Sequence, residues 1–419
     1  MATQPNLIEV TDWLSMEALR LLTNALEVAP CFNSDYDDQL DMEFPVGKTF
    51  RVPLPDNFLI RNGLQYTPQS IVDRHTDVSC DQIHGIDFEW DTVEGALTMP
   101  RTEERIRKKV LIPAMKKQRQ EIDSRAANFA MLNTPNAVGI LGTSPTDFDA
   151  IYGAADERLT VLAGNSEDKT MLLSPGMARS LRKSAVSYFN PTDEIAAMFK
   201  KGYIGEVTGF GQSYQSMSLY QTTSDLWQGT VEVNTTLTAD ASSMLLTVTS
   251  GDTFTQGTPY VIADVYDVNP MTLRSTGNLK NFVVTDSITA TGGTVTVNFY
   301  PGIVGPGSPY QNVSAYPVAG ADLTQYYGTV GVNAGTKIGV NGLAITKDAF
   351  ALVGVKLQNP KAESAQIVSQ AQDPETGVAV AFLRMFDPVS RKWINRFDSC
   401  YGFGRLWADH CSIRVLGLN

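Results

Sequence analysis

Val295-Thr-Val-Asn-Phe299 alternates apolar and polar residues, and turn residues flank this run as Gly292-Gly293 and Pro301-Gly302. Alternation with a period of two is typical of a half-buried strand, and glycine and proline favour turns. Leu246-Thr-Val248 and Phe282-Val-Val-Thr285 repeat the pattern nearby. The spacing of these strands and turns is typical of a β-sandwich.

Composition sets the limits of this β-rich region. From about Leu226 to Asn333 the chain is rich in Thr, Val, Ser and Gly, and Arg274 and Lys280 are its only cations. The sequence on either side is less Thr-rich and more helical. Because insertion at a loop costs little chain entropy, we predict a separate all-β domain inserted at 226–333 into another domain.

Helical patterns lie on both sides of the predicted insert. An apolar stripe predicts an amphipathic helix from about Thr11 to Val28, and Ala29-Pro30 ends it. The longest helix is predicted to begin at Thr102, and Pro113 should kink it or begin a second segment. Ser174 to Val186 is also predicted to be helical.

Two more runs of period two lie between the first two helices and predict a hairpin-like pair of strands. Apolar residues alternate at Phe50, Val52 and Leu54, and again at Ile86, Phe88 and Trp90. The second run carries carboxylates and the first lies near cations, so opposite charges could bind a neighbouring subunit. The residues expected at such a contact are Lys48, Arg51, Asp87, Glu89 and Asp91.

Length and charge exclude several classes of protein. The 419 residues exceed the usual size of one core, so two or three domains are expected. The formal charge is 33 − 45 = −12, so tight binding to nucleic-acid phosphates is not expected. Met1 to Leu14 has no basic residue before its apolar part, unlike a signal peptide, and no apolar run is long enough to span a bilayer.

Residue types suited to a metal site occur at Asp73, His75, Cys80, Asp81 and His84, but their spacing matches no common zinc motif. The sequence contains neither a GxSxG nucleophile motif nor a GxGxxG or GK[ST] phosphate loop. We therefore expect no enzyme activity, no cofactor and no bound metal.

Several stretches, in order along nearly the whole chain, resemble the coat-protein family of the short-tailed phage P-22 and its relatives. They are LRLLTNALEVAP at 19–30, GYIGEVTGF at 202–210, GTPYVIADVYDVNP at 257–270 with LRSTGNLKNFVV at 273–284, and GLAITKDAF at 342–350 with RFDSCYGFG at 396–404. The sequence departs from the family pattern at Asp264, where a small residue, often glycine, is expected.

The resemblance implies an α+β, HK-97-type phage capsid fold with an inserted immunoglobulin-like β-sandwich. Its parts would be an N-terminal arm with a helix (1–47), an extended hairpin loop (48–98), a spine helix with the peripheral domain (99–140), an axial domain in two parts (141–225 and 334–395), the insert (226–333) and the C-terminal strands of the peripheral domain (396–419).

The resemblance also implies a role and partners. The subunit would be made in the cytoplasm of the bacterial host and end in the virion. It would assemble as hexamers and pentamers into an icosahedral shell with a scaffolding protein and a portal protein, then expand as double-stranded DNA enters. The shell would enclose DNA without reading its sequence, and no membrane contact is implied.

Two contacts of the subunit are predicted at particular residues. The arm helix is the predicted scaffold-binding site, at Glu17, Arg20 and Glu27. Arg274 and Lys280 are predicted to reach a carboxylate of a neighbouring subunit, with two solubilising surface charges as the alternative.

Two other classes of protein stay open at this point. One is a non-catalytic virion-surface protein or adhesin whose β-domain binds a receptor, and the other is an acidic hydrolase that uses two carboxylates. Electron microscopy of the purified chain separates these classes from a shell subunit.

Overall fold

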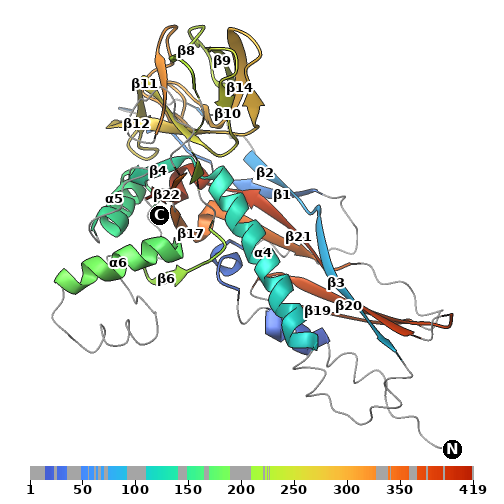
Figure 1. Cartoon of the computed structure of the whole chain (residues 1–419). Coiled ribbons are helices and arrows are strands. Elements are labelled where there is room, and N and C mark those ends of the chain that lie inside the picture. Colours follow the sequence, from blue (N-terminus) through green and yellow to red (C-terminus); the bar gives the residue numbers. More distant parts are fainter. Residues whose placement is uncertain are drawn as a thin grey trace, which may run out of the picture. The chain divides into compact units, whose positions relative to one another are not determined.

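In the computed structural model of the chain the residues fall into two compact units (Figure 1). Unit 1 comprises Met1–Pro53, His75–Ala126 and Ala351–Gly404, and unit 2 comprises Leu54–Arg74, Ala127–Phe350 and Arg405–Asn419. The structure describes residues 15–22, 26–34, 49–54, 56–60, 63–64, 68–69, 74–91, 110–139, 149–164, 169–188, 209–219, 222–223, 225, 227–326, 338–339, 341–357, 366–373, 376–389 and 392–417.

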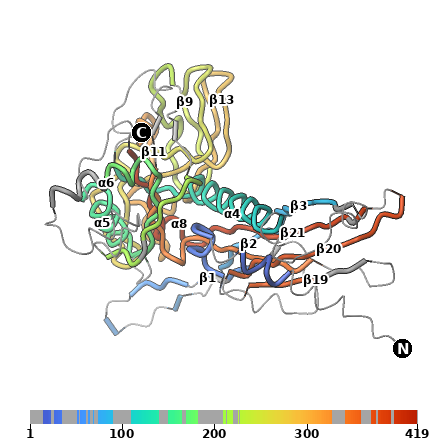
Figure 2. Tube along the Cα trace, turned by 60° about the horizontal axis from the view of Figure 1, so that its bottom comes forward, coloured from blue at the N-terminus to red at the C-terminus, as the bar shows by residue number. Residues whose placement is uncertain are grey.

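Unit 1 is built on an antiparallel sheet in the order β18-β21-β20-β19, with β3 also paired to β21. Figure 2 shows β3, β21 and β20 running side by side. A second, two-stranded sheet joins β1 to β2. The strands are β1 (Thr49–Leu54), β2 (Arg74–Ser79), β3 (Gln82–Asp91), β18 (Phe350–Val355), β19 (Gln366–Gln372), β20 (Ala379–Asp387) and β21 (Lys392–Arg405).

Pairing in unit 1 corrects the predicted hairpin. Both predicted runs form strands, β1 and β3, but they do not pair with each other. All ten residues of β3 pair with β21, from Gln82 opposite Tyr401 to Asp91 opposite Lys392. Alternation identifies a strand, whereas its partner depends on tertiary contacts that the pattern does not contain.

Helices pack on the sheet of unit 1 through polar contacts. A helix at 15–22 places the Ser15 hydroxyl 2.7 Å from that of Ser369 in β19. In helix α4 (Ile112–Asn133), the Gln118 amide donates to the Ser399 hydroxyl in β21 at 2.7 Å. Pro113 lies in the first turn of α4, where its missing N–H is tolerated, which agrees with the alternative that it begins a helical segment. Thr102, the predicted start, lies outside the described residues.

One carboxylate of α4 fixes the end of the N-terminal segment. Asp123 accepts the backbone N–H groups of Glu27, Val28 and Ala29 at 3.1, 3.1 and 3.2 Å, at the start of the 3₁₀ turn η1 (Ala29–Cys31). Burial raises the pKa of Asp123, and the three N–H donors act against that rise.

Unit 2 contains a mixed five-stranded sheet in the order β4-β22-β17-β5-β6, in which β4 runs parallel to β22 and β6 parallel to β5. Its strands are β4 (Asn136–Gly139), β5 (Lys169–Leu173), β6 (Gln212–Gln215), β17 (Asn341–Thr346) and β22 (Ser412–Leu416). The accompanying helical segments are η4 (Asp149–Gly153), α5 (Ala154–Val161), α6 (Pro175–Tyr188), η5 (Lys347–Ala349) and α8 (Ala408–Cys411). Helix α6 lies where Ser174 to Val186 was predicted to be helical.

The second part of unit 2 is a closed β-barrel in the order β11-β12-β14-β9-β8-β15. Its strands are β8 (Val231–Val233), β9 (Ala241–Thr247), β11 (Pro259–Val268), β12 (Ser275–Val284), β14 (Thr294–Ile303) and β15 (Asp322–Gln325), and a short pair joins β10 (Thr253–Phe254) to β13 (Ile288–Thr289). The barrel has its own core, in which the Trp227 ring stacks on Tyr260 with centroids 5.5 Å apart.

Closure of this barrel corrects the predicted sandwich. Tyr260 of β11 pairs with Phe282 of β12 on one side and with Gln325 of β15 on the other. The two outer strands of the sheet therefore meet, and no open edge separates two sheets. The six barrel strands all lie between Val231 and Gln325, within the predicted range 226–333.

The chain enters and leaves the barrel at one place. Strand β7 (Thr222–Thr223) pairs with β16 (Ile338–Gly339). Nearer the barrel, the Asp225 N–H donates to Oε1 of Gln325 at 3.1 Å, and Nε2 of Gln325 donates back to the Asp225 carbonyl at 3.1 Å. The Asp225 carboxylate accepts the Thr255 N–H and the Tyr260 hydroxyl, and burial raises its pKa. The two linkers are thus joined to each other before the barrel begins.

The backbone conformation at Asp264 explains why a small residue, often glycine, is expected at this position. Asp264 is exposed in β11 with φ +61°, within the register shift between Val261 and Tyr266, so the backbone there adopts the left-handed conformation that favours glycine.

We expect Asp264→Gly to stabilise the barrel by about 0.5–1 kcal/mol, because relief of a left-handed strain of about 1–2 kcal/mol exceeds the extra chain entropy of glycine, about 0.4–1 kcal/mol. The measurement is the urea midpoint of barrel unfolding. Asp322→Gly, at an exposed strand position of β15 without positive φ, is the control and should destabilise. Equal destabilisation by both variants would contradict the argument.

Candidate functional site

A buried group of charges lies where the barrel meets the mixed sheet of unit 2. Asp267 of β11 and Lys280 of β12 have fully buried side chains, with Nζ of Lys280 3.0 Å from Oδ1 of Asp267. Nη2 of Arg158, from α5 beside the mixed sheet, is 2.9 Å from Oδ2 of the same carboxylate. We call Arg158, Asp267 and Lys280 the junction cluster. One carboxylate thus joins a cation of the barrel to a cation of the body.

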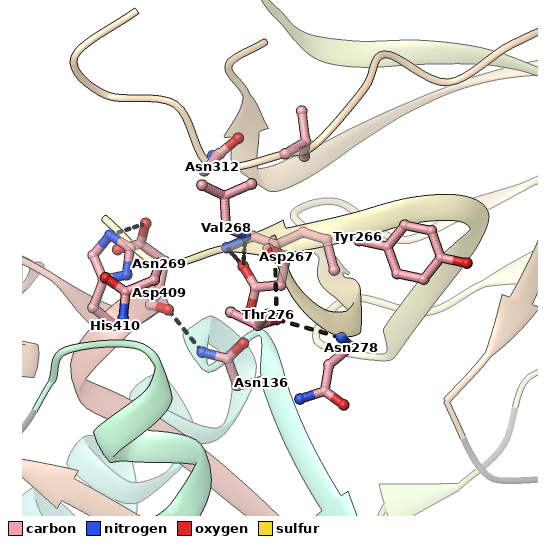
Figure 3. A network of polar contacts seen from close by, with 12 residues as sticks. Asn136, Tyr266, Asp267, Val268, Asn269, Thr276, Asn278, Asn312, Asp409 and His410 are labelled. Carbon is pink, nitrogen blue, oxygen red and sulfur yellow. Dashed lines mark hydrogen bonds and ion pairs between the residues drawn. The ribbon is translucent and has the colours of Figure 1, made fainter. Parts of the chain in front are cut away.

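Backbone contacts hold the β11–β12 hairpin at this junction, and Figure 3 shows part of the network. The Val268 N–H donates to Oδ1 of Asp267 at 3.0 Å, and the Thr276 hydroxyl donates to the Asp267 carbonyl at 3.2 Å. Nδ2 of Asn269 donates to the carbonyl of Val161, at the end of α5, at 2.7 Å. The hairpin is therefore fixed both to itself and to α5.

Helix α8 adds polar groups to the junction. Nδ2 of Asn136 in β4 donates to the Asp409 carbonyl at 2.7 Å, and Nε2 of His410 is 3.2 Å from Oδ2 of Asp409, as drawn in Figure 3. The hydroxyl of Tyr300, from β14 of the barrel, lies 3.5 Å from Oδ1 of Asp409. Burial raises the pKa of Tyr300 and lowers that of His410. Both groups are therefore kept uncharged at neutral pH.

Arg414 of β22 connects the barrel to the end of α4. Its Nη1 donates to the Gly257 carbonyl at 2.8 Å, and its Nη2 donates to the carbonyls of Met131 and Thr134. At Gly257, φ is +80°, and an added Cβ would lie 2.9 Å from Cα of Leu132. The barrel backbone thus approaches α4 as closely as a residue without a side chain allows.

The residues of the junction are suited to holding the barrel in one position on the mixed sheet. Its charged groups are paired inside the protein, and such pairs favour one geometry over others at little net gain in stability. No cluster of three or more metal-ligating side chains occurs among the described residues. None of the helices in the described part of the chain has the length and apolar character needed to cross a membrane.

Lys280 corrects one predicted contact. Its ammonium is fully buried and bonded to Asp267 of the same chain, so it does not reach a neighbouring subunit. Arg274, at the turn before β12, is exposed, and its predicted contact stays a prediction. The sequence showed a lone cation but not its burial, because Asp267 precedes it by 13 residues and Arg158 lies 109 residues before Asp267.

The predicted acidic row lies on the surface of unit 1. Glu89 contacts Lys392, and Asp87 lies 3.7 Å from Arg396; both cations belong to the neighbouring strand β21. Arg51 in β1 lies 3.6 Å from Asp77 in β2. The described charges therefore have partners within the chain and remain exposed. Lys48 lies outside the described residues, and only the backbone of Asp91 is described.

The predicted scaffold-binding residues lie at the N-terminal helix and just after it. Nε of Arg20 is 2.9 Å from the Glu17 carboxylate, one helical turn away. Glu27 lies 4.0 Å from Arg119 of α4, and burial raises its pKa, with Asp123 adding to the rise. Of the three, Arg20 is the most exposed, so it has the most surface for a partner.

Sequence reasoning missed Arg158, Asp267 and Arg414. Nothing in the local pattern marks them, since each gains its role from a partner distant in sequence. The available signal was Lys280 itself, a single lysine in a strand of a nearly cation-free domain, because such a charge is rarely buried without a carboxylate.

No family model matches the chain, and no curated protein matches it. Among solved structures, "Mycobacterium phage Che8" is similar, with 13% identity over 93% of this chain and 91% of that chain and a TM-score of 0.48. "Capsid of Ralstonia phage GP4" has 9% identity over 95% and 93% of the two chains, with a TM-score of 0.42. "CUS-3 coat protein I-domain" has 24% identity over 24% of this chain and 96% of that chain, with a TM-score of 0.19.

Proposed function

We propose that this chain is the major capsid protein of a tailed bacteriophage, a structural subunit without catalytic activity. The observation that supports the proposal most is the placement of an independent barrel between two halves of a helix-bearing body. The resemblance implies an inserted domain at 226–333, an interval that contains every strand of the barrel, and the resembling motifs lie before and after it in the family's order.

The proposal extends to the parts of an HK-97-type subunit. The segment at 15–34 would be the arm, β1 to β3 the extended loop, α4 the spine helix, and the mixed sheet of unit 2 the axial domain. Hexamers and pentamers of the subunit would form the shell around a scaffolding protein and a portal protein, and the shell would expand on DNA entry. Many modest contacts, repeated around a closed shell, bind strongly together.

The charges support self-assembly over nucleic-acid binding. The net charge of −12 disfavours adhesion of DNA to the wall. Several surface charges already pair within the chain, as Glu89 does with Lys392, and such exposed pairs contribute about 0.2–1 kcal/mol each. Contacts of this strength break and re-form, which allows errors to be corrected as a shell grows.

Negative-stain electron microscopy of the purified chain, alone and with a candidate scaffolding protein, tests the proposal. We expect shells or tubular aggregates of regular subunits. Monodisperse monomers that bind a receptor through the barrel would instead favour the adhesin, and turnover of a sugar or peptide would favour the hydrolase. Either result would overturn the capsid assignment.

Arg274→Glu tests the predicted contact of the β11–β12 hairpin. We expect a severalfold lower yield of regular shells with unchanged unfolding of the monomer, because a loss of about 0.2–1 kcal/mol is repeated at every copy of the contact. Lys347→Glu, at an exposed cation outside the barrel, is the matched control. Shells of wild-type shape and yield from Arg274→Glu would remove this contact from the proposal.

A further inference from the structure

We propose that His410 makes the docking of the barrel acid-labile, so that protonation of its imidazole releases the barrel from the mixed sheet while the barrel itself stays folded. His410 lies in α8, on the body side of the junction, and its side chain is 18% exposed. This limited exposure lets a proton reach a ring that is otherwise surrounded by protein.

The hydrogen bonds of the ring suit a neutral imidazole. Nε2 faces Oδ2 of Asp409 at 3.2 Å. Nδ1 is buried, and no described residue hydrogen-bonds to it. A neutral ring can leave one nitrogen without a proton, whereas an imidazolium carries a proton on both and would bury a second N–H donor without an acceptor.

The charges around His410 come from both sides of the junction. Lys280 in β12 and Arg74 in β2 oppose a positive ring, whereas Asp409 in α8 and Asp267 in β11 favour one. Asp267 is already paired with two cations of the junction cluster, so it has little attraction left for a third. Asp409 also faces the Tyr300 hydroxyl, whose ring lies 4.5 Å from the Arg405 guanidinium. Burial is the largest effect and lowers the pKa of His410 from its ordinary value of 6.5, with the two cations adding to the fall and the two carboxylates acting against it.

The sign of the pH effect follows from this lowered pKa. The docked state binds the proton less well than the released state does, so docking is complete above the ordinary pKa and weakens as the pH falls below it. Each fall of one pH unit in this window raises the equilibrium constant for release of the barrel by up to about tenfold. The rise ends when the pH reaches the pKa of His410 in the docked state.

The core of the barrel should stay folded at the pH at which the contacts of the junction weaken. The three histidines of the chain are His75, His84 and His410, and none lies between 227 and 326. Asp225, at the base of the barrel, has a raised pKa, so acid favours its folded environment. Acid therefore weakens the contact between barrel and body before it weakens the barrel.

Hydrogen exchange of the full, unassembled chain tests the inference independently of any shell. Between about pH 7.5 and about pH 5 we expect protection factors to fall, up to about tenfold per pH unit, in α8, the end of α5 and the β11–β12 hairpin tip, but not in β9 or β14. His410→Gln should abolish this response, and His75→Gln, at an exposed position of β2, should keep it. The same response in His410→Gln and wild type would overturn the inference.

A direct titration keeps the test valid if His410→Gln fails to fold. With only three histidines, NMR spectra of His75→Gln and His84→Gln assign the His410 ring by elimination. We expect the His410 ring to titrate below its ordinary pKa, in step with the loss of protection. Titration at or above the ordinary value would contradict the inference.

Discussion

Asp267→Asn should lower the free energy of unfolding of unit 2 by about 3–5 kcal/mol. The amide can keep the hydrogen bond from the Val268 N–H, but it cannot balance the charges of Lys280 and Arg158, whose side chains are 0% and 9% exposed. The measurement is urea denaturation of the full chain, with hydrogen exchange to locate the loss.

A double-mutant cycle gives the control for this prediction. Lys280→Met removes one of the two cations that Asp267→Asn leaves without a carboxylate. In the Lys280→Met background, Asp267→Asn should therefore lower the free energy of unfolding by less, and the coupling free energy between the two sites should exceed about 1 kcal/mol. Asp286→Asn changes an exposed carboxylate of the same barrel and should shift stability by less than about 0.5 kcal/mol. A loss at Asp267 no larger than that at Asp286 would mean that the junction cluster does not hold the barrel in place.

Gly257→Ala should destabilise the docked barrel by about 2–5 kcal/mol. A left-handed φ of +80° costs a residue with a side chain about 1–2 kcal/mol, and overlap with the α4 backbone at Leu132 adds about 1–3 kcal/mol. The Arg414 bond to the Gly257 carbonyl is displaced with it. The measurement is the midpoint of urea denaturation.

Gly277→Ala separates the two causes. Gly277 has nearly the same φ, +81°, but its added Cβ would meet no atom within 4 Å. This control should therefore lose only the conformational part, about 1–2 kcal/mol. Equal losses at both glycines would show that the close approach to α4 contributes nothing.

Local sequence patterns predicted several strands of the barrel but did not predict that the sheet closes. Val295 to Phe299 forms part of β14 as its alternation predicts, because one face of the strand meets an apolar core. The closing pair, β11 with β15, joins segments about sixty residues apart through backbone hydrogen bonds that no side-chain pattern records. A sandwich and a barrel therefore have the same local sequence signature.

The candidate site was the least predictable part for a related reason. Lys280 looked like a surface charge, and its burial depends on Asp267 and Arg158, which the fold brings to it. Asp264 is the opposite case, since the expectation of a glycine there matches a left-handed φ that the structure contains. A conformational requirement of the backbone restricts the residue type at a single position, so a sequence pattern can reveal it. An ion pair between residues distant in sequence gives no such local pattern.

The pair of hydrogen bonds between Asp225 and Gln325 holds the two ends of the barrel together, so another domain could in principle replace the barrel. A module whose termini lie as near to each other could replace it without spreading β7 and β16 apart. In the recipient body, Arg158 would lose its carboxylate partner, and Nη1 of Arg414 would lose the Gly257 carbonyl while Nη2 kept the carbonyls of Met131 and Thr134. A transplanted module would therefore need to supply a carboxylate and a free carbonyl at those two places, or the body would have to lose both arginines.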